Sequence, residues 1–503
     1  MTQATKDKAI ALKTVIDLFQ ALDARGVRYC HWKSNLRLKL GLRGQTDLDL
    51  LVDPEHARDF REVLEEHQVK LVLAPPGKHY PAVENYLGLD PTAGKLFHLH
   101  VHYQLVLGEQ FVKNYRLPLE DVFLHAVRFD HGVKIPAPEL ELIVLSLRAL
   151  LKYRDRDVIK DILSIRSPGI PAHVLDEIHW LLGQISVQDL SKLLVHLPKV
   201  IPSDVVVEFL ETVVASPRDG YKLYRLRRRV RGVLRRYQRQ DRFRASLRYF
   251  GEVWRRRKSF LRFRPANKMT LPVKGLTVAL VGADGAGKTT LCHELARWLS
   301  WKLDVRLHYL GSKKPSWLSK RLHLLFRIAR RSQRTCSGWF GEKNVISRVA
   351  LRIQRVLLYS HCLSIGRDRY RRYRIGRRRV ANGSIVIYDR FPLIARLDGP
   401  QIPSLTDGNR GIVSSIFSKS EHNLYRKFQY PDLLVVLHVK PATSLRRKPD
   451  HRRHVIKAKN LLLRNLTDGT AVTPIETNWV HLNADLPFED VLKRLKQEVW
   501  AAL

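Results

Sequence analysis

The chain has 503 residues, enough for about two or three domains, and 45% of them are hydrophobic, which is ample for packed cores. Its four cysteines (Cys30, Cys292, Cys336 and Cys362) show neither zinc-site nor disulfide-framework spacing, which excludes a disulfide-stapled scaffold and favours a reducing compartment. Lysine and arginine number 89 against 48 acids, a formal net charge of +41 that predicts a polyanionic partner: nucleic acid, an anionic lipid surface or an acidic glycan.

The first 25 residues do not resemble a signal peptide. They are polar and then amphipathic, with Val15, Leu18, Phe19 and Leu22 at helical spacing. The sequence contains no apolar run of 18 residues, so no membrane span is expected. The expected location is cytoplasmic, with peripheral attachment to the inner membrane face as an option that the basic charge leaves open.

Residues 1–135 alternate helical and strand-like segments and are predicted to form the first domain. Asp47 and Asp49 lie two residues apart in the strand-like run 44–52, so both side chains share one face of the strand. Nucleotidyltransferases use two carboxylates in this arrangement to hold Mg²⁺ on a triphosphate. The alternative is an ordinary polar sheet face, and the two acids alone do not choose between these interpretations.

The surroundings of these acids resemble a bacterial nucleotidyltransferase-like family, whose members carry a lysine before the acids and a later strand with an acid followed by histidine. Here the segment 31–34, His-Trp-Lys-Ser, precedes the acids, and the histidine-rich segment 98–103 follows them. The resemblance implies an α+β nucleotidyltransferase-like fold for the first domain. His100 stands where the third acid is expected, so the implied site binds either a nucleotide or one metal ion through Asp47, Asp49 and His100.

A helical subdomain is predicted at residues 136–217, and a basic helical connector at 218–270. Within the connector, apolar residues recur at helical spacing between arginines: Leu223, Leu226, Val230, Val233, Leu234 and Tyr237. This pattern predicts a basic amphipathic helix, which either adsorbs to an anionic membrane or packs its apolar stripe on protein. The second interpretation is favoured. No nucleic-acid-binding signature accompanies the basic clusters, so no specific nucleic-acid partner is expected.

The most informative motif opens the last region, residues 271–503. The pattern G-x-x-x-x-G-K-T lies between an apolar strand-like run and an amphipathic helix. The expected phosphate-binding residues are Gly282, Asp284, Gly285, Gly287, Lys288, Thr289 and Thr290. In such a loop, backbone N–H groups and the helix N-terminus point at phosphate oxygens. Lys288 is expected to reach the β- and γ-phosphates and Thr289 to hold Mg²⁺, so ATP and Mg²⁺ are the expected cofactors.

Two further strand-like segments end in charged residues: 384–391 ends in Asp-Arg-Phe, and 431–448 ends in Arg-Arg-Lys. Together with the loop sequence G-x-D-G-x-G-K-T-T, they resemble the thymidylate kinase family, in which an Asp-Arg-aromatic strand end is followed by a Pro-Asp-Leu strand and a basic lid. The resemblance extends to a last strand at 480–484 and a closing helix at 488–502. It implies an α/β fold, a P-loop parallel sheet with helices on both faces.

The resemblance also implies roles for single residues. Asp284 contacts the acceptor's sugar, Arg390 holds its phosphate, and Asp389 orients Mg²⁺ waters or Arg390. Arg447 falls at the lid arginine, and further lid candidates are Lys448, Arg452 and Arg453. The implied catalytic set is Lys288, Asp389, Arg390 and Arg447, and the implied metal set in this domain is Thr289 and Asp389. The alternative for Asp389 and Arg390 is a structural ion pair at a strand end, and the catalytic interpretation is favoured.

The chain departs from that family at three positions. Val281 replaces the usual acid before the first loop glycine, Pro392 the usual serine after the aromatic residue, and His438 a common acid of the third strand. The thymine pocket is therefore not recognisable. The predicted function is transfer of the γ-phosphoryl of Mg-ATP to a phosphate-bearing acceptor, most simply a nucleoside monophosphate such as dTMP, or another phosphorylated small molecule. The alternatives are a nucleotidyltransferase with an accessory kinase-like domain and a nucleotide-gated peripheral membrane adaptor.

Overall fold

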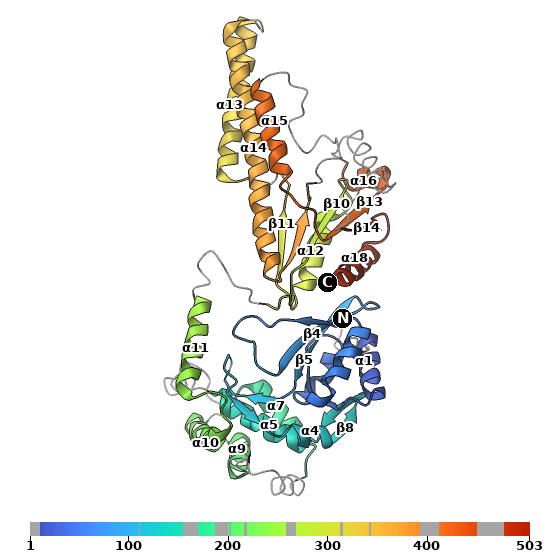
Figure 1. The fold of residues 1–503 in the computed structure, drawn as a ribbon, viewed down its shortest axis with the longest axis vertical. Coiled ribbons are helices and arrows are strands. Elements are labelled where there is room, and N and C mark those ends of the chain that lie inside the picture. The colour runs from blue at the N-terminus through green and yellow to red at the C-terminus, as the bar shows by residue number, and fades with distance from the viewer. Residues whose placement is uncertain are drawn as a thin grey trace. The chain divides into compact units, whose positions relative to one another are not determined.

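The computed structural model describes residues 11–109, 111–153, 170–186, 200, 203–215, 219–257, 268–311, 315–341, 344–392, 412–449 and 477–503. The chain divides into two compact units, Met1–Met269 and Thr270–Leu503 (Figure 1). The helical region and the basic connector that the sequence sets apart both belong to the first unit. The lid candidates Arg452 and Arg453 lie outside the described residues.

A five-stranded sheet with the order β1-β2-β5-β4-β3 forms the centre of the first unit. Its strands are β1 (Tyr29–His31), β2 (Asp47–Val52), β3 (Lys70–Val72), β4 (Val83–Asp90) and β5 (Lys95–His102). β2 and β5 run parallel, and the other neighbours run antiparallel. The parallel register pairs Asp47 with His98 and Asp49 with His100, so the two-acid strand lies directly beside the histidine strand.

Short helices and two hairpins surround this sheet. They are α1 (Lys13–Ala24), η2 (Asn35–Arg37), α2 (Leu38–Leu42), η3 (Pro54–His56), α3 (Ala57–Glu66), β6 (Leu105–Leu107), β7 (Tyr115–Leu117), α4 (Glu120–His125), β8 (Val127–Asp130) and β9 (Val133–Pro136). α1 buries Val15, Leu18, Phe19 and Leu22, the residues that share one face by their spacing. These side chains enter the same hydrophobic core as the inner face of β2.

A second core lies in the helical part of the first unit. Its helices are α5 (Pro138–Lys152), α7 (Ala172–Leu182), α9 (Ser203–Ala215), α10 (Gly220–Val233), η4 (Leu234–Tyr237) and α11 (Arg242–Arg257). Leu223, Leu226, Val230 and Leu234 of the predicted basic helix are fully buried in this core, alongside α5 and α9. The apolar stripe at 223–237 therefore packs mainly on protein, as the favoured interpretation holds.

The second unit confirms the expected α/β class. Its sheet is wholly parallel and has the order β11-β12-β10-β13-β14. The strands are β10 (Thr277–Gly282), β11 (Val305–Tyr309), β12 (Ile385–Asp389), β13 (Leu433–His438) and β14 (Asn478–Asn483). The phosphate loop follows the central strand β10, so it opens at the edge where all five strands end.

The described helices of this unit lie on both sides of the sheet or extend beyond it. They are α12 (Lys288–Leu299), α13 (Trp317–Phe340), α14 (Val345–Ala381), α15 (Ile412–Tyr425), α16 (Pro441–Arg447) and α18 (Phe488–Ala502). Gly376 of α14 packs against the hydroxyl group of Tyr388. Thr289 of α12 donates a hydrogen bond to the next residue of the strand, Asp389. Because adjacent strand residues face opposite ways, α12 and α14 lie on opposite faces of β12. Within the described ranges, no helix is both long and apolar enough to cross a membrane.

Candidate active site

The phosphate loop joins β10 to α12, and its glycines adopt backbone conformations that other residues avoid. Gly285 and Gly287 have φ angles of +89° and +83°. A Cβ at Gly285 would also lie 2.9 Å from the carbonyl oxygen of Ser444, so the loop approaches α16 too closely for a side chain. Gly287 is the N-cap of α12, and the free N–H groups of the first helical turn therefore face the loop.

Lys288 is buried and folds back across this loop. Its Nζ donates hydrogen bonds to the carbonyl oxygens of Gly282, at 2.8 Å, and Ala283, at 2.6 Å. The two bonds hold a positive charge within the loop before any ligand binds. A triphosphate in the loop would therefore meet a preorganised cation. Such a cation stabilises developing negative charge more strongly than water does, because it does not have to reorient.

The two residues predicted to serve the metal ion meet at the start of α12. Thr289 Oγ1 donates a hydrogen bond to Asp389 Oδ2 at 2.8 Å, although the residues are 100 positions apart in the chain. The second carboxylate oxygen, Oδ1, is buried and accepts no hydrogen bond from the described residues. A hydroxyl oxygen beside a carboxylate with an unused lone pair fits the oxygen ligation that Mg²⁺ requires.

Arg390 and Asp284, the residues implied to contact the acceptor, also lie together. Arg390 Nη2 is 3.6 Å from Asp284 Oδ1, and the guanidinium carbon is 5.8 Å from the ring centre of Tyr309. Arg390 has a φ of +65°, which costs energy for a residue with a Cβ and is typical of functional positions. The two charged residues at the end of β12 thus each pair with a residue of the phosphate-loop region.

The Arg447 side chain contacts the backbone of the phosphate loop. Its Nη1 donates to the carbonyl oxygens of Ala484, at 3.0 Å, and Gly285, at 3.4 Å. From the same helix, the Ser444 hydroxyl donates to the Asp284 carbonyl oxygen. In this structure Arg447 therefore acts as a positioning residue that ties the loop to α16 and to the end of β14. Its role in a lid remains a prediction.

Sequence reasoning missed Tyr309 and Ser444. Tyr309 ends β11, and the carboxyl ends of parallel strands meet at one edge, so the strand order would have pointed to it. Ser444 has no such signal, because its contact with the loop arises only from the packing of α16.

A second cluster of charged side chains lies in the first unit between β2 and β5. Asp47 Oδ1 is 2.9 Å from His98 Nδ1, and Asp49 Oδ1 is 2.8 Å from His100 Nδ1. Lys33 Nζ approaches Asp49 Oδ1 to 2.7 Å. The residues singled out by the first resemblance are therefore brought together by the parallel register of the two strands.

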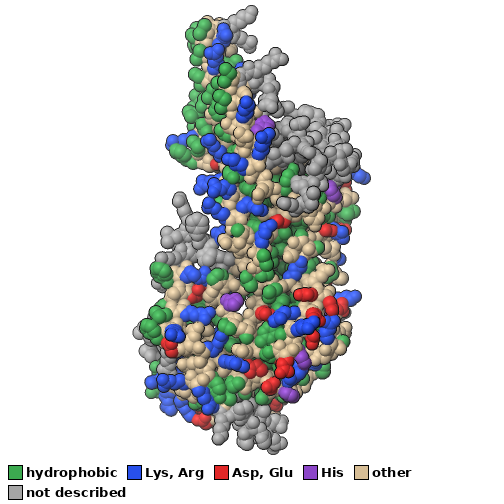
Figure 2. Space-filling view, viewed as in Figure 1, with side chains coloured by type: hydrophobic (Ala, Val, Ile, Leu, Met, Phe, Trp, Pro, Cys, Tyr) green, Lys and Arg blue, Asp and Glu red, His purple; other side chains and the backbone are tan. Residues whose placement is uncertain are grey.

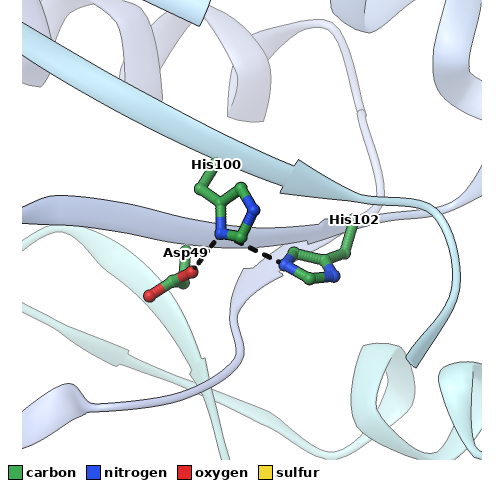
Figure 3. A group of neighbouring side chains, drawn as sticks. All are labelled: Asp49, His100 and His102. Atoms are coloured by element: carbon green, nitrogen blue, oxygen red, sulfur yellow. Dashed lines mark hydrogen bonds and ion pairs between the residues drawn. The ribbon is translucent and has the colours of Figure 1, made fainter. Parts of the chain in front are cut away.

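Figure 3 shows Asp49, His100 and His102 converging. Their potential ligand atoms lie within 4.8 Å of one another. This group shares Asp49 and His100 with the expected metal set, whereas Asp47 lies beside His98. Metal binding by either set stays a prediction. His102 is two residues beyond His100, so the period of a strand places both on one face, a signal that was present in the sequence.

The electrostatics of this cluster differ from those of a two-carboxylate metal clamp. Burial by itself raises the pKa of Asp49, but Lys33 and His100 outweigh it and hold that pKa well below its usual range. Burial lowers the pKa of His100 to about 4 and also lowers the pKa of Lys33. At neutral pH the Asp49 carboxylate is therefore already paired with an ammonium group, which weakens its attraction for a divalent cation.

A buried polar chain that the sequence did not signal lies beside this cluster. Glu141 of α5 accepts hydrogen bonds from the backbone N–H of Asn35, at 3.0 Å, and from Asn35 Nδ2, at 2.7 Å. Asn35 Oδ1 in turn lies 2.5 Å from His31 Nδ1. Burial raises the pKa of the Glu141 carboxyl to about 7 despite the two donors. These hydrogen bonds thus link α5 to the segment that carries Lys33.

We expect the Glu141→Gln variant to have a different pH dependence of stability. The folded-state pKa lies above the unfolded value, so folding takes up a proton and this group lowers the free energy of unfolding as pH rises from about 4.5 to 7. Relative to wild type, the variant should gain roughly 1–3 kcal/mol across that range. Urea unfolding at pH 5 and pH 7.5 measures this. Glu139→Gln on the same helix is the control, and an equal gain there would contradict the assignment.

Comparisons with known proteins bear on about half of the chain. No protein-family model matches this chain. It is 27% identical over 257 residues to the uncharacterized ATP-binding protein YghR of Escherichia coli K12, covering 48% of this chain and 94% of the relative. It is also 27% identical over 237 residues to the uncharacterized ATP-binding protein YghS of that strain, covering 45% and 93%.

A solved structure, that of deoxyadenosine kinase from M. mycoides with bound dATP, covers 44% of this chain and 98% of its own at 12% identity and a TM-score of 0.25. The names of the two relatives do not support the nucleotidyltransferase resemblance of the first domain.

Proposed function

We propose that the second unit transfers the γ-phosphoryl group of Mg-ATP to a phosphate-bearing acceptor. The observation that carries this proposal is the pairing of Thr289 with Asp389 and of Arg390 with Asp284 at one edge of the parallel sheet. One pair offers oxygen ligands to a divalent cation, and the other offers a guanidinium group to an anion. Donor and acceptor sites of a phosphotransferase need these two functions side by side.

The donor half of the site rests on the phosphate loop. The N–H groups of the loop and of the first turn of α12 face the phosphates, and Lys288 neutralises charge on the transferring group. Thr289 and Asp389 would hold Mg²⁺, which when bound would supply positive charge at the phosphates. The relatives in E. coli carry ATP binding in their names, which supports ATP as the donor.

The acceptor half rests on Arg390. Its 3.6 Å separation from Asp284 is longer than a hydrogen bond, so the guanidinium keeps donors for a planar, bidentate contact with phosphate. The neighbouring Asp284 carboxylate can accept hydrogen bonds from sugar hydroxyls, and the Tyr309 ring lies within reach of the guanidinium. These groups suit a nucleoside monophosphate, with dTMP as the first candidate because of the family resemblance.

The acceptor panel is the test of this function. The full chain is incubated with Mg-ATP and, in turn, with dTMP, the other nucleoside monophosphates and non-nucleotide sugar phosphates, and ADP formation is followed. We expect ADP formation to depend on one class of acceptor and to stop when Mg²⁺ is chelated. ADP formation at one rate regardless of acceptor would contradict the kinase and favour a nucleotide-gated switch.

The first unit does not favour a second, nucleotidyl-transferring activity. That chemistry needs carboxylates free to hold a metal ion on a triphosphate. Here Asp47 and Asp49 are engaged by His98, His100 and Lys33.

A further inference from the structure

The second unit carries a long helical hairpin that its sheet does not need. α13 and α14 are 24 and 37 residues long, and only α14 reaches the sheet, where it contacts β11 and β12. Figure 1 shows α13 and the first half of α14 (yellow to light orange) projecting well beyond the strands of this unit.

The contact between the two helices includes a group of polar side chains. Ser319 Oγ lies 2.7 Å from Ser364 Oγ and 2.7 Å from Asp368 Oδ2, and the Ser319 carbonyl oxygen is 3.1 Å from His361 Nδ1. Ser319, Ser347 and Ser364 are buried. A water-soluble hairpin ordinarily buries its large apolar residues between the helices, and here small polar residues occupy part of that position.

Many large apolar side chains of the hairpin lie on its outside. On α14, Val345, Val349, Ile353 and Val356 recur every three or four residues and are exposed, so they form one continuous stripe. On α13, Trp317, Leu324 and Ile328 are exposed, and their spacings of seven and four residues place them on one face. Figure 2 shows hydrophobic side chains running along the hairpin with lysines and arginines among them. An apolar surface of this extent marks a binding surface.

Exposed apolar side chains also lie where α13 ends and where α14 begins. Trp339 is 81% exposed and Val345 71% exposed, and Phe340 and Ile346 beside them are about half exposed. Tryptophan and phenylalanine with short aliphatic neighbours are typical of segments that enter the headgroup region of a bilayer. We name these four side chains the hairpin tip.

Charge selects among the possible occupants of this surface. Between residues 317 and 356 the only acid is Glu342, whereas the basic residues are Lys320, Arg321, Arg327, Arg330, Arg331, Arg334, Lys343, Arg348, Arg352 and Arg355. A second copy of the hairpin would bring like charges together. A nucleic acid would neutralise the arginines but leave the hairpin tip in water. An anionic lipid surface satisfies both, because its phosphates pair with the arginines and its acyl boundary takes up the apolar side chains.

We propose that the α13–α14 hairpin docks this protein on an anionic lipid bilayer, with the hairpin tip in the headgroup region and Arg348, Arg352 and Arg355 on lipid phosphates. This surface is separate from the basic helix that the sequence suggested, whose stripe packs inside the first unit. The kinase chemistry proposed above does not depend on it. Docking would restrict phosphoryl transfer to the membrane surface.

Vesicle co-sedimentation of the full chain tests the proposal, with vesicles of phosphatidylcholine alone or mixed with phosphatidylglycerol, at physiological salt. We expect binding to the anionic vesicles to be at least about tenfold tighter than to the neutral ones. A variant with Trp339→Ser, Phe340→Ser, Val345→Ser and Ile346→Ser should lose about tenfold or more of that binding. The charge variant Arg348→Gln, Arg352→Gln, Arg355→Gln should lose the preference for anionic lipid.

The matched control is Phe250→Ser with Trp254→Ser on α11, which also exposes aromatic residues beside arginines. This control should bind vesicles like wild type. Circular dichroism and ADP formation in solution should be unchanged in all three variants, because the changes lie far from the phosphate loop or in the first unit. Equal binding to neutral and anionic vesicles, or loss in the α11 control alone, would overturn the proposal. A lipid-free dimer abolished by the hairpin-tip variant would overturn it in favour of a second copy.

Discussion

Replacing Lys288 by alanine is expected to lower acceptor-dependent ADP formation by about a thousandfold. The ammonium group of Lys288 lies inside the phosphate loop, where it donates hydrogen bonds to the carbonyl oxygens of Gly282 and Ala283. The positive charge is therefore in place before the triphosphate binds. In the variant, the charge that develops on the transferring phosphoryl group loses its preorganised counter-ion. A coupled ADP assay at saturating Mg-ATP measures the effect.

Lys493→Ala, an exposed lysine on α18, removes the same charge from the same unit without touching the loop. Its rate should match wild type. Thermal unfolding of Lys288→Ala should show that the unit remains folded, because the two lost hydrogen bonds are local to the loop. A folded Lys288→Ala protein with wild-type turnover would remove this site from the proposed function.

Replacing Arg390 by alanine is expected to impair the acceptor side selectively. We expect the kcat/KM for the acceptor to fall by roughly a hundredfold or more, with little change in the KM for ATP, because the lost guanidinium forms charge-assisted hydrogen bonds to the acceptor phosphate. Alanine is a fair replacement at this position, since it bears the same Cβ penalty as arginine at a φ of +65°. Initial rates over a matrix of both substrate concentrations separate the two effects.

Two further variants sharpen this result. Arg390→Lys keeps the charge but not the planar fork, so it should recover only part of the activity. Arg297→Ala removes an exposed arginine of α12 that pairs with Glu294, and it should behave as wild type. If Arg390→Ala raised the KM for ATP and left that for the acceptor unchanged, Arg390 would belong to the donor half, and the proposed division of the site would be wrong.

Much of the second unit could be predicted from local sequence. In a phosphate loop, the strand, the glycine-rich turn and the helix follow one another directly in the sequence. Gly285, Gly287, Lys288 and Thr289 therefore predict the loop without any information on long-range contacts. The strands β12 and β13 could also be predicted locally, because buried strands appear as continuous apolar runs. The predicted last strand and closing helix correspond to β14 and α18.

The contacts of the charged residues could not be predicted from the sequence in the same way. The sequence did not show that Asp389 bonds to Thr289, or that Asp49 meets Lys33 and His102. These contacts depend on which strands become neighbours, and the strand order results from the packing of the whole sheet. The parallel alignment of β2 with β5 places Asp47 beside His98 and Asp49 beside His100.

By itself the sequence determined the local chemistry of this protein: a phosphate-binding loop, a charged strand end and a basic amphipathic helix. Only the tertiary structure decided which apolar stripe is buried. The stripe of α10 lies in the core between α5 and α9, whereas that of α13 and α14 faces outwards. Helical periodicity shows that a face is apolar, but not what covers it. The cover depends on elements distant in the chain, because burial is a property of the packed assembly and not of one helix.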